Sequence, residues 1–317
     1  MKNLLKEKLP LIYQIVAYIK YYKKFIENKH FSLKIGKMSE EELKEYDASL
    51  YRIRQNRELD WNNLKTYTEK MQWAKLFDKD PRKTVYSDKY EVRKWIEKEI
   101  GSDYLIPLIG IWDNYSDIDW KSLPNQFVIK TNHGSGDAVI VRDKKNMTLA
   151  KKLEIRRKIK FSLLTDYSSK YCEMQYKNIC PKIIVEKYLD TGNKDLVDYK
   201  FLCFDGKPYF CWVDMDRFTN HTRNVYDLEW NLQSWNQRSY GNYKGKIKKP
   251  ENFDEMIKIA TKLSKEFSHV RVDLYNFKGK IYFGEMTFTN GSGFEEIVPH
   301  EADDMLGNIW RLPGIDS

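Results

Sequence analysis

The sequence has little cysteine and no long hydrophobic run, and both absences exclude whole classes of protein. Its four cysteines show no C-x-x-C spacing and have no histidines at zinc-site distances, so a metal-thiolate centre is not expected. The main apolar stretch, residues 9–19, is shorter than the roughly 20 residues that cross a bilayer. Charged residues interrupt the start of the chain and no small-residue cleavage site follows, so a secretory signal is not expected. We therefore expect a cytoplasmic protein whose thiols stay reduced. The cysteines are Cys172, Cys180, Cys203 and Cys211.

Two common phosphate-binding patterns, G-x-x-x-x-G-K-[ST] and a strand-to-helix G-x-G-x-x-G, are also missing. What is present is the composition of a folded globular chain. Hydrophobic residues make up 41% and aromatic residues 15%, which excludes both a disordered chain and a polytopic membrane protein. With 317 residues, the chain is long enough for two or three subdomains and a cleft between them.

The net charge of +9 is concentrated in two segments. Residues 1–40 and residues 143–160 each carry +6, which leaves −3 for the rest of the chain. Local patches of this kind differ from a basic surface spread along a duplex. Nucleic acid is therefore not expected as a partner.

The first 35 residues predict a basic amphipathic helix. Apolar residues recur at helical spacing, and Lys20, Lys23 and Lys24 follow them. Two interpretations remain open: the helix packs on the body or on a second subunit, or it lies on anionic lipid as a peripheral contact at the inner face of the membrane. The oligomeric state is left open. The apolar positions are Leu11, Ile12, Ile15, Val16 and Ile19.

The pattern of elements predicts an α+β fold. Charged helical segments over 39–80, 87–101 and 148–160 alternate irregularly with strands. Strand character marks residues 104–106, 108–112, 126–130, 138–141 and 182–189. Two hairpins are expected, 198–204 with 209–213 about Asp205-Gly206, and 269–277 with 280–286 about Lys278-Gly279. Antiparallel hairpins without regular strand-helix alternation exclude a doubly wound parallel sheet.

The C-terminal hairpin carries the strongest chemical signal. Strand alternation places Arg271 and Asp273 on one face, and the turn sets Asp273 nearly opposite Glu285. Two adjacent carboxylates repel each other unless a cation lies between them, and oxygen ligands suit Mg²⁺ that bridges to phosphates. Arg271 would neutralise phosphate charge. The alternative is an ordinary surface hairpin whose polar residues face water.

A second signal is the KTNHGSG run at residues 130–136. A lysine at a strand end followed by glycines lets backbone amides approach a phosphate while the ammonium neutralises it. The EKYL run at 186–189 is a third, weaker signal, because an acidic residue and free backbone groups at a strand end can bind an adenine edge.

Taken in order, these runs resemble the ATP-grasp superfamily. Within it, five segments resemble the TupA-like branch, which is found in bacterial surface-polysaccharide clusters. They are MQWAKLF at 71–77, YSDKYEVR at 86–93, KTNHGSG at 130–136, DYKF at 198–201 and GEMTFTNGSGF at 284–294. The likeness covers roughly residues 60–312. It implies an ATP-grasp fold, in which two α+β subdomains clasp ATP, here preceded by a helical N-terminal region.

The resemblance also implies ATP and Mg²⁺ as cofactors and gives roles by position. Lys89 and Lys130 would hold phosphates, Glu186 and the backbone after it adenine, Asp198 the ribose and Lys200 the nucleotide. The expected nucleotide contacts are Lys89, Lys130, Gly134, Ser135, Gly136, Glu186, Lys187, Tyr188, Leu189, Asp198 and Lys200.

For catalysis, the resemblance implies Arg271 and Lys130. The chain departs from the superfamily at Thr287, where an asparagine usually completes the metal shell, so Thr287 or Asn290 would take that place. The expected metal ligands are Asp273, Glu285 and Thr287.

The implied reaction is ADP-forming amide synthesis through an acyl phosphate, which needs no side-chain nucleophile. The expected partners are an amino acid or amine and a uronic acid of a capsular or other surface polysaccharide, free or linked to a nucleotide or lipid. Exposed aromatics in 212–240 would stack on sugar rings, with Arg217, Arg223 and Arg238 for acidic groups. The alternative for these aromatics is the core. The candidate aromatics are Trp212, Trp230, Trp235 and Tyr240.

Two other functions stay open. A glycosyltransferase using a nucleotide sugar would need a D-x-D metal motif, which Asp214-Met215-Asp216 matches. A non-catalytic polysaccharide-assembly protein would act through its basic N-terminus. For the ligase, the expected division is a helical region (1–60), an N-terminal subdomain (61–125), a lid (126–192) and a C-terminal subdomain with the metal site (193–317).

Overall fold

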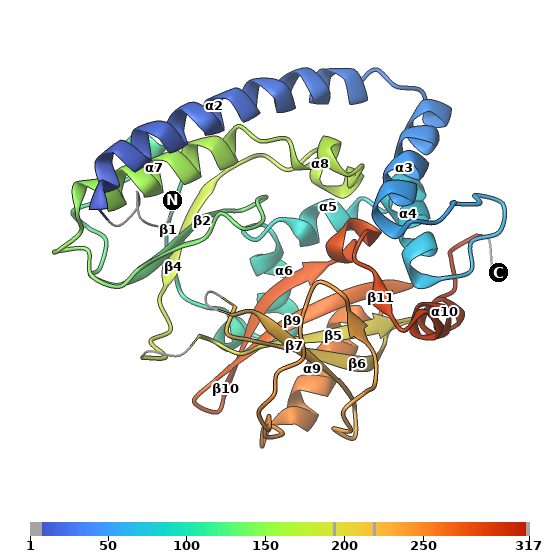
Figure 1. Ribbon diagram of the computed structural model, residues 1–317. Helices are drawn as coiled ribbons and strands as arrows, with labels where there is room; N and C mark the ends of the chain where they lie inside the picture. Colours follow the sequence, from blue (N-terminus) through green and yellow to red (C-terminus); the bar gives the residue numbers. More distant parts are fainter. Residues whose placement is uncertain (1–7, 193–194, 218–219, 315–317) are drawn as a thin grey trace.

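The computed structural model describes residues 8–192, 195–217 and 220–314. The first seven residues of the expected N-terminal helix lie outside this part. Figure 1 shows two layers of strands with helices around them, which confirms the α+β class. None of the helices in the described residues is long and apolar enough to cross a membrane.

The N-terminal region consists of helices, as expected. Ser39 and Thr66 each form a capping box with the glutamate three residues on, which satisfies the first free amides of two of them. The helices are α2 (Pro10–Ile35), α3 (Glu40–Gln55) and α4 (Tyr67–Phe77).

Helix α2 packs on the body, but not through its most apolar face. Gln14 and Ala17 are buried, and Tyr18 and Phe25 contact the ring of Phe161 at centroid distances of 5.5 and 6.2 Å. The five apolar positions named from the sequence are 44 to 61% exposed. In Figure 1, α2 runs along the outer edge of the molecule over α7.

The smaller sheet is antiparallel, in the order β1-β4-β2-β3. Strand β2 buries every second residue, and Phe127 and Ile129 pack with Ile155 and Ile159 of α7. Its helices and strands are β1 (Leu108–Trp112), β2 (Phe127–Thr131), β3 (Val139–Val141), α7 (Leu149–Leu163), α8 (Tyr167–Lys170) and β4 (Ile183–Lys187).

The larger sheet is also antiparallel, in the order β10-β9-β5-β6-β7. Helix α9 covers one face, where Phe253 and Met256 meet Phe201 and Val272, and α4 and α10 pack on the other. Both hairpins expected from the sequence are confirmed. The elements are β5 (Asp198–Phe204), β6 (Lys207–Met215), β7 (Thr222–Asp227), α9 (Phe253–Ser264), β9 (His269–Phe277), β10 (Lys280–Thr287) and α10 (His300–Ile309).

Two local expectations were wrong. The helix expected over 87–101 begins only at Val92, because the side chain of Asp88 caps a turn by accepting from the amides of Tyr90 and Glu91 at 2.8 and 3.2 Å. No strand forms over 104–106, because Tyr104 ends a 3₁₀ turn and Leu105 and Ile106 lie in the loop before β1. The remaining elements are α5 (Arg82–Ser87), α6 (Val92–Glu99), β8 (Asn236–Gln237), β11 (Ile297–Val298) and the 3₁₀ turns Ser102–Tyr104, Tyr115–Asp117, Met174–Tyr176 and Asn290–Gly293.

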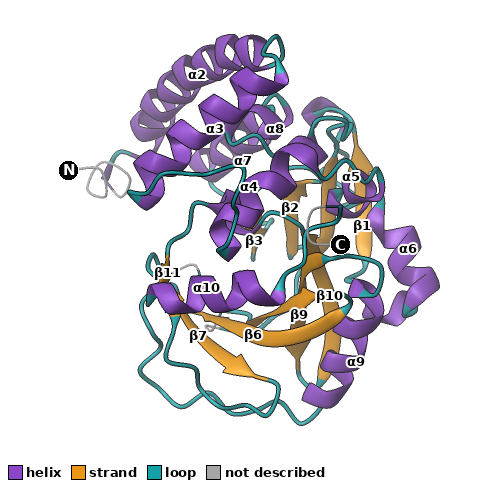
Figure 2. Cartoon of the chain, turned by 90° about the vertical axis from the view of Figure 1, so that its right-hand side faces the viewer, coloured by secondary structure: helices purple, strands orange, loops and turns teal. Residues whose placement is uncertain are grey.

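Figure 2 shows how the two sheets lie relative to each other. The smaller sheet, with β2 and β3, lies above the larger sheet, with β6, β7, β9 and β10. Residues of the loops between β2 and β3 and after β4 line one cavity together with residues of β5 and β10. A second cavity lies next to it, toward β6 and β7.

Candidate active site

Two cavities lie side by side between the sheets. The first, of about 250 Å³, is bounded by the β2–β3 turn, the end of β4, β5 and β10. The second, of about 240 Å³, lies toward β6, β7 and the turn after β10. Every site residue expected from the sequence lines at least one of them, except the buried Asp273. The residues that line both are Lys89, Gly134, Ser135, Arg217 and Glu285.

Hydrogen bonds to Asp137 hold the two ends of the glycine turn, residues 130–137, together. The carboxylate of Asp137 accepts from the amide and hydroxyl of Thr131 at 2.7 and 2.6 Å and from the hydroxyl of Ser162 at 2.8 Å. These groups crowd Gly134, where an added Cβ would lie 2.4 Å from the Thr131 hydroxyl. Gly136 has φ of +74°, which favours glycine. The turn is therefore rigid at its ends, with its tip directed to the cavities.

Lys89 links the two layers. Its ammonium donates to the carbonyl of Gly134 at 2.8 Å and lies 3.8 Å from Glu285 Oε2. Its own amide donates to the Asn132 carbonyl at 3.0 Å. A cation thus sits at the border of the two cavities, between the glycine turn and the C-terminal hairpin.

The end of β4 forms the inner wall of the first cavity. Glu186 accepts from Lys130 at 2.6 Å and from Arg93 at 3.3 Å, so its carboxylate is held by two cations. The amide of Lys187 donates to the carbonyl of Pro107 at 2.9 Å and is not available to a ligand. The lining continues through Tyr188 and Leu189.

The C-terminal hairpin has the expected register. Asp273 pairs with Glu285, after an irregularity at Gly284, where an added Cβ would lie 3.0 Å from the Asp273 carbonyl. Arg271 forms two bonds of 2.7 Å with Asp273, and its Nη2 lies 3.3 Å from Glu285 Oε1 and 3.0 Å from the Thr287 hydroxyl. The hairpin is therefore not an ordinary surface hairpin.

Lys200 lies on the neighbouring strand β5. Its ammonium is 2.6 Å from Asp198 and 2.5 Å from Asp273, and Arg217 also lies 3.0 Å from Asp198. Asp198 lines the first cavity, as expected for a nucleotide contact, whereas Lys200 lines the second.

Glu285 is ionised in this surrounding. Burial acts to raise its pKa, but four nearby cations outweigh burial and hold the pKa well below its usual range. These cations are Lys89, Arg271, Lys200 and Arg217.

The donor set fits a magnesium ion that arrives with phosphates. In the described residues, no three His, Cys, Asp or Glu side chains come together. Mg²⁺ needs only one or two protein carboxylates when phosphates and water complete its shell. Glu285 is 34% exposed and borders both cavities, whereas both oxygens of Asp273 accept from Arg271 or Lys200. Glu285 is thus the accessible donor, with the Thr287 hydroxyl 3.1 Å away.

Sequence reasoning missed Glu173. Its carboxylate accepts from the hydroxyls of Thr289 and Ser292 at 2.5 and 2.9 Å, and burial raises its pKa. No Lys, Arg or His of the described residues forms an ion pair with it. The partners are more than 110 residues away in the chain, so no local pattern could have pointed to this group.

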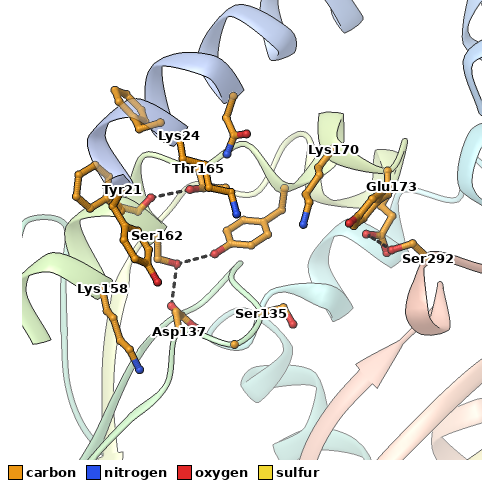
Figure 3. A pocket seen from close by; sticks show the side chains of 16 residues that line it. Tyr21, Lys24, Ser135, Asp137, Lys158, Ser162, Thr165, Lys170, Glu173 and Ser292 are labelled. Atoms are coloured by element: carbon orange, nitrogen blue, oxygen red, sulfur yellow. Dashed lines mark hydrogen bonds between the residues drawn. The ribbon is translucent and has the colours of Figure 1, made fainter. Parts of the chain in front are cut away.

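Glu173 also borders a third cavity, of about 380 Å³, between α2, α7 and the glycine turn. Figure 3 shows the side chains of Lys24, Lys158 and Lys170 around this cavity and Glu173 next to Ser292. Ser135, Gly136 and Asp137 line both this cavity and the first.

Only some of the residues expected to bind a sugar line a cavity. Trp212 and Trp235 are buried in the core and Trp230 is stacked on Tyr226 at 4.3 Å, so these three are not free to stack on sugar. Tyr240, Arg217 and Arg223 do line the second cavity. Arg238 instead pairs with Glu296 at the surface.

The D-x-D motif is engaged within the protein. Arg223 binds both oxygens of Asp214, at 2.5 and 2.7 Å, and lowers the pKa of that buried carboxyl together with His221, although burial opposes the shift. A metal would have to displace this bidentate pair.

Comparison with known proteins gives one family. The family model of TupA-like ATP-grasp proteins matches residues 69–311. No curated protein matches the chain.

Solved structures that resemble the chain include three ligases. D-alanine–D-alanine ligase from Bacillus anthracis, complexed with ATP, shares 17% identity over 65% of this chain and 54% of its own, with a TM-score of 0.37. D-alanine–D-alanine ligase from Helicobacter pylori shares 12% over 72% and 59%, with a TM-score of 0.39. L-amino acid ligase from Bacillus licheniformis shares 14% over 73% and 51%, with a TM-score of 0.45. The chain spans about half to three fifths of the length of these proteins.

Proposed function

The chain belongs to the TupA-like ATP-grasp family and has the ATP-grasp fold, and from this premise we propose that it is an ATP- and Mg²⁺-dependent carboxylate–amine ligase. The observation that carries the proposal is the common border of the two cavities. There, a glycine turn, a lysine and a low-pKa carboxylate meet where one cavity would hold ATP and the other the acceptor.

In this proposal, ATP occupies the first cavity. Its adenine lies against residues 186–189 and its ribose against Asp198, while its phosphates follow the glycine turn to Lys89 and Lys130. The Lys187 amide is engaged with Pro107, so adenine would use other backbone groups of this segment. When bound, a magnesium ion supplies charge neutralisation to the phosphates, and Glu285 and the Thr287 hydroxyl would hold it. Asp273 would join them by giving up a bond to Arg271 or Lys200.

The reaction has two steps. A carboxylate oxygen of the acceptor attacks the γ-phosphorus, the bond to ADP breaks, and an acyl phosphate forms. The amine nitrogen then attacks the acyl carbon, and phosphate and a proton leave as the amide forms. Arg271 is fixed by Asp273 and lines the second cavity, so it is placed to stabilise the charge on the transferring phosphoryl group. Lys130, oriented by Glu186, lines only the first cavity and would hold the phosphates of ATP there.

The substrates follow from the second and third cavities. Arg217, whose side chain is 45% exposed and borders both cavities, would bind the acidic acceptor, which fits a uronic acid of a bacterial capsular or other surface polysaccharide. Glu173 would receive the ammonium of an amino acid or amine, since its carboxylate lines the second and third cavities and forms no ion pair among the described residues. The lysines of the third cavity would hold the rest of an anionic glycan.

The working division remains a helical region over 1–60, an N-terminal subdomain over 61–125, a lid over 126–192 and a C-terminal subdomain over 193–317. Strand β1 reaches from the second region into the sheet of the lid. We place the enzyme in the cytoplasm, with residues 1–35 at the inner face of the membrane and no nucleic acid among its partners.

The test is a phosphate-release screen. The protein is incubated with Mg²⁺, ATP, a panel of uronates and a panel of amino acids, and ADP, phosphate and amide are quantified. We expect equal amounts of all three for the productive pair. Release of AMP and pyrophosphate would contradict an acyl phosphate. Thermal stabilisation by a UDP-sugar but not by ATP would support the glycosyltransferase instead.

A further inference from the structure

The outer face of α2 is an apolar stripe that is left exposed by residues 8–192, 195–217 and 220–314, the part of the chain that the structure describes. Six large apolar side chains recur at intervals of three, four or seven residues, and each is 40 to 61% exposed. Leu11 and Val16 extend the stripe to either side, because they lie about 70° from its centre at 100° per residue. The six are Ile12, Ile15, Ile19, Tyr22, Ile26 and Leu33.

The opposite face of α2 is anchored, so the stripe cannot turn inward. Arg157 of α7 donates to the side chain of Gln14 at 3.3 Å and lies 4.4 Å from the ring centroid of Tyr21. The hydroxyl of Ser32 donates to Asp166. Contacts along the length of the helix therefore fix which face points outward.

The fold also brings the two basic segments together. Residues 8–40 contain seven lysines and two glutamates, and residues 143–160 contain eight basic and two acidic residues. Helix α7, from the second segment, packs directly against α2. Together they carry +11, more than the +9 of the whole chain, so this one side of the molecule holds all the excess positive charge.

The charges border the stripe. Lys20, Lys23 and Lys34 lie along one side of it and Lys29 along the other, and Glu27 is the single acidic residue of α2. On α7, which packs against α2, Lys152, Arg156 and Lys160 are exposed at four-residue spacing and lie on one face of the helix.

We propose that this face of α2 binds an anionic lipid bilayer surface, with the helix lying in the plane of the membrane. An apolar stripe flanked by lysines is the pattern of an interfacial helix: the apolar side chains enter the acyl boundary and the ammonium groups meet the lipid headgroups. At 1.5 Å per residue, the 26 residues of α2 give about 39 Å of contact.

A second copy of the chain fits this surface less well. Pairing two α2 helices would bring two strongly positive surfaces together, and the heptad spacing of the stripe would place Lys29 in the seam. Glu27 alone on each helix could not neutralise them. The positive charge that borders the stripe therefore favours an anionic surface as the occupant.

The experiment is co-sedimentation of the full chain with vesicles of phosphatidylcholine alone or with one quarter phosphatidylglycerol. We expect binding only to the anionic vesicles, weaker at high salt. The double variant Ile15→Ser, Ile19→Ser should weaken the partition coefficient by about 100-fold, since two isoleucines leave the interface. Leu232→Ser, which alters an apolar side chain that is 59% exposed elsewhere, should bind as the wild type.

An unchanged thermal shift with ATP would establish that the double variant is folded. The proposal is overturned if the anionic vesicles do not bind the wild type, or if the double variant binds them equally well. A dimer would also overturn it. If light scattering finds the wild type dimeric and the double variant monomeric, and the wild type does not bind vesicles, the occupant of the stripe is a second copy.

Discussion

Replacing Glu285 by glutamine should separate the binding of ATP from the binding of its metal. Glutamine keeps the size of the side chain and removes its charge. Because four cations surround Glu285, ATP without metal should bind the variant at least as well as the wild type. What should be lost is the additional stabilisation that Mg²⁺ gives, since the accessible carboxylate donor is gone.

The size of the effect can be worked out for a thermal melt. ATP·Mg²⁺ at 100 times its Kd stabilises the folded state by about 2.7 kcal/mol. Unfolding entropy of about 2.1 cal/mol/K per residue over the chain converts this to a Tm increase of about 4 °C. The wild type should therefore show this increase with Mg²⁺ and a smaller one with EDTA, whereas Glu285→Gln should show the same small increase in both.

The control is Glu251→Gln, whose carboxylate is 93% exposed, pairs with Lys248 and lines neither cavity. It should behave as the wild type. If Glu285→Gln keeps the full difference between Mg²⁺ and EDTA, Glu285 is not a metal ligand and the proposed site is wrong.

Three further predictions concern single groups. Gly134→Ala should abolish the ATP shift, because its Cβ would meet the Thr131 hydroxyl, whereas Gly241→Ala, with open space around it, should retain it; equal shifts would contradict the role of the turn. Burial lowers the pKa of His269 to about 3, so the unfolded chain takes up the proton first and stability falls as pH decreases from about 6.5 toward 3, by up to about 1.4 kcal/mol per pH unit. Urea denaturation from pH 7 to 4 should give a shallower slope for His269→Asn, and an equal slope would refute this. Glu173→Gln should raise the KM for the amine at least tenfold and leave the ATP shift unchanged; an unchanged KM would remove Glu173 from the amine site.

The sequence allowed the hairpin chemistry to be predicted because it depends on local rules. Strand alternation and a two-residue turn were enough to set Asp273 opposite Glu285, as the register confirms. The glycine turn and the EKYL segment were equally local, and both line the first cavity. Their position in one site followed from the resemblance to a family, not from spacing.

Other features could not be read from the sequence because they depend on contacts between distant segments. Periodicity identified α2 but not which face the body covers, since Tyr18 and Tyr21 contact Phe161 of α7. Ile12, Ile15 and Ile19 remain exposed. The burial of Trp212 and the position of Glu173 depend in the same way on partners elsewhere in the chain. The pairing of Asp214 with Arg223, which occupies the D-x-D motif, could not be read from the sequence either.

The contact between Lys89 and Glu285 has a consequence for how the protein is synthesised. The two residues are separated by almost 200 positions, and β1 likewise pairs with β4 across more than 70. Contacts of such long range form late in folding and slow it. While the chain leaves the ribosome, the smaller sheet can close as soon as β4 has emerged, but the site is complete only after β10. Nucleotide binding would then distinguish a finished molecule from a partly folded one.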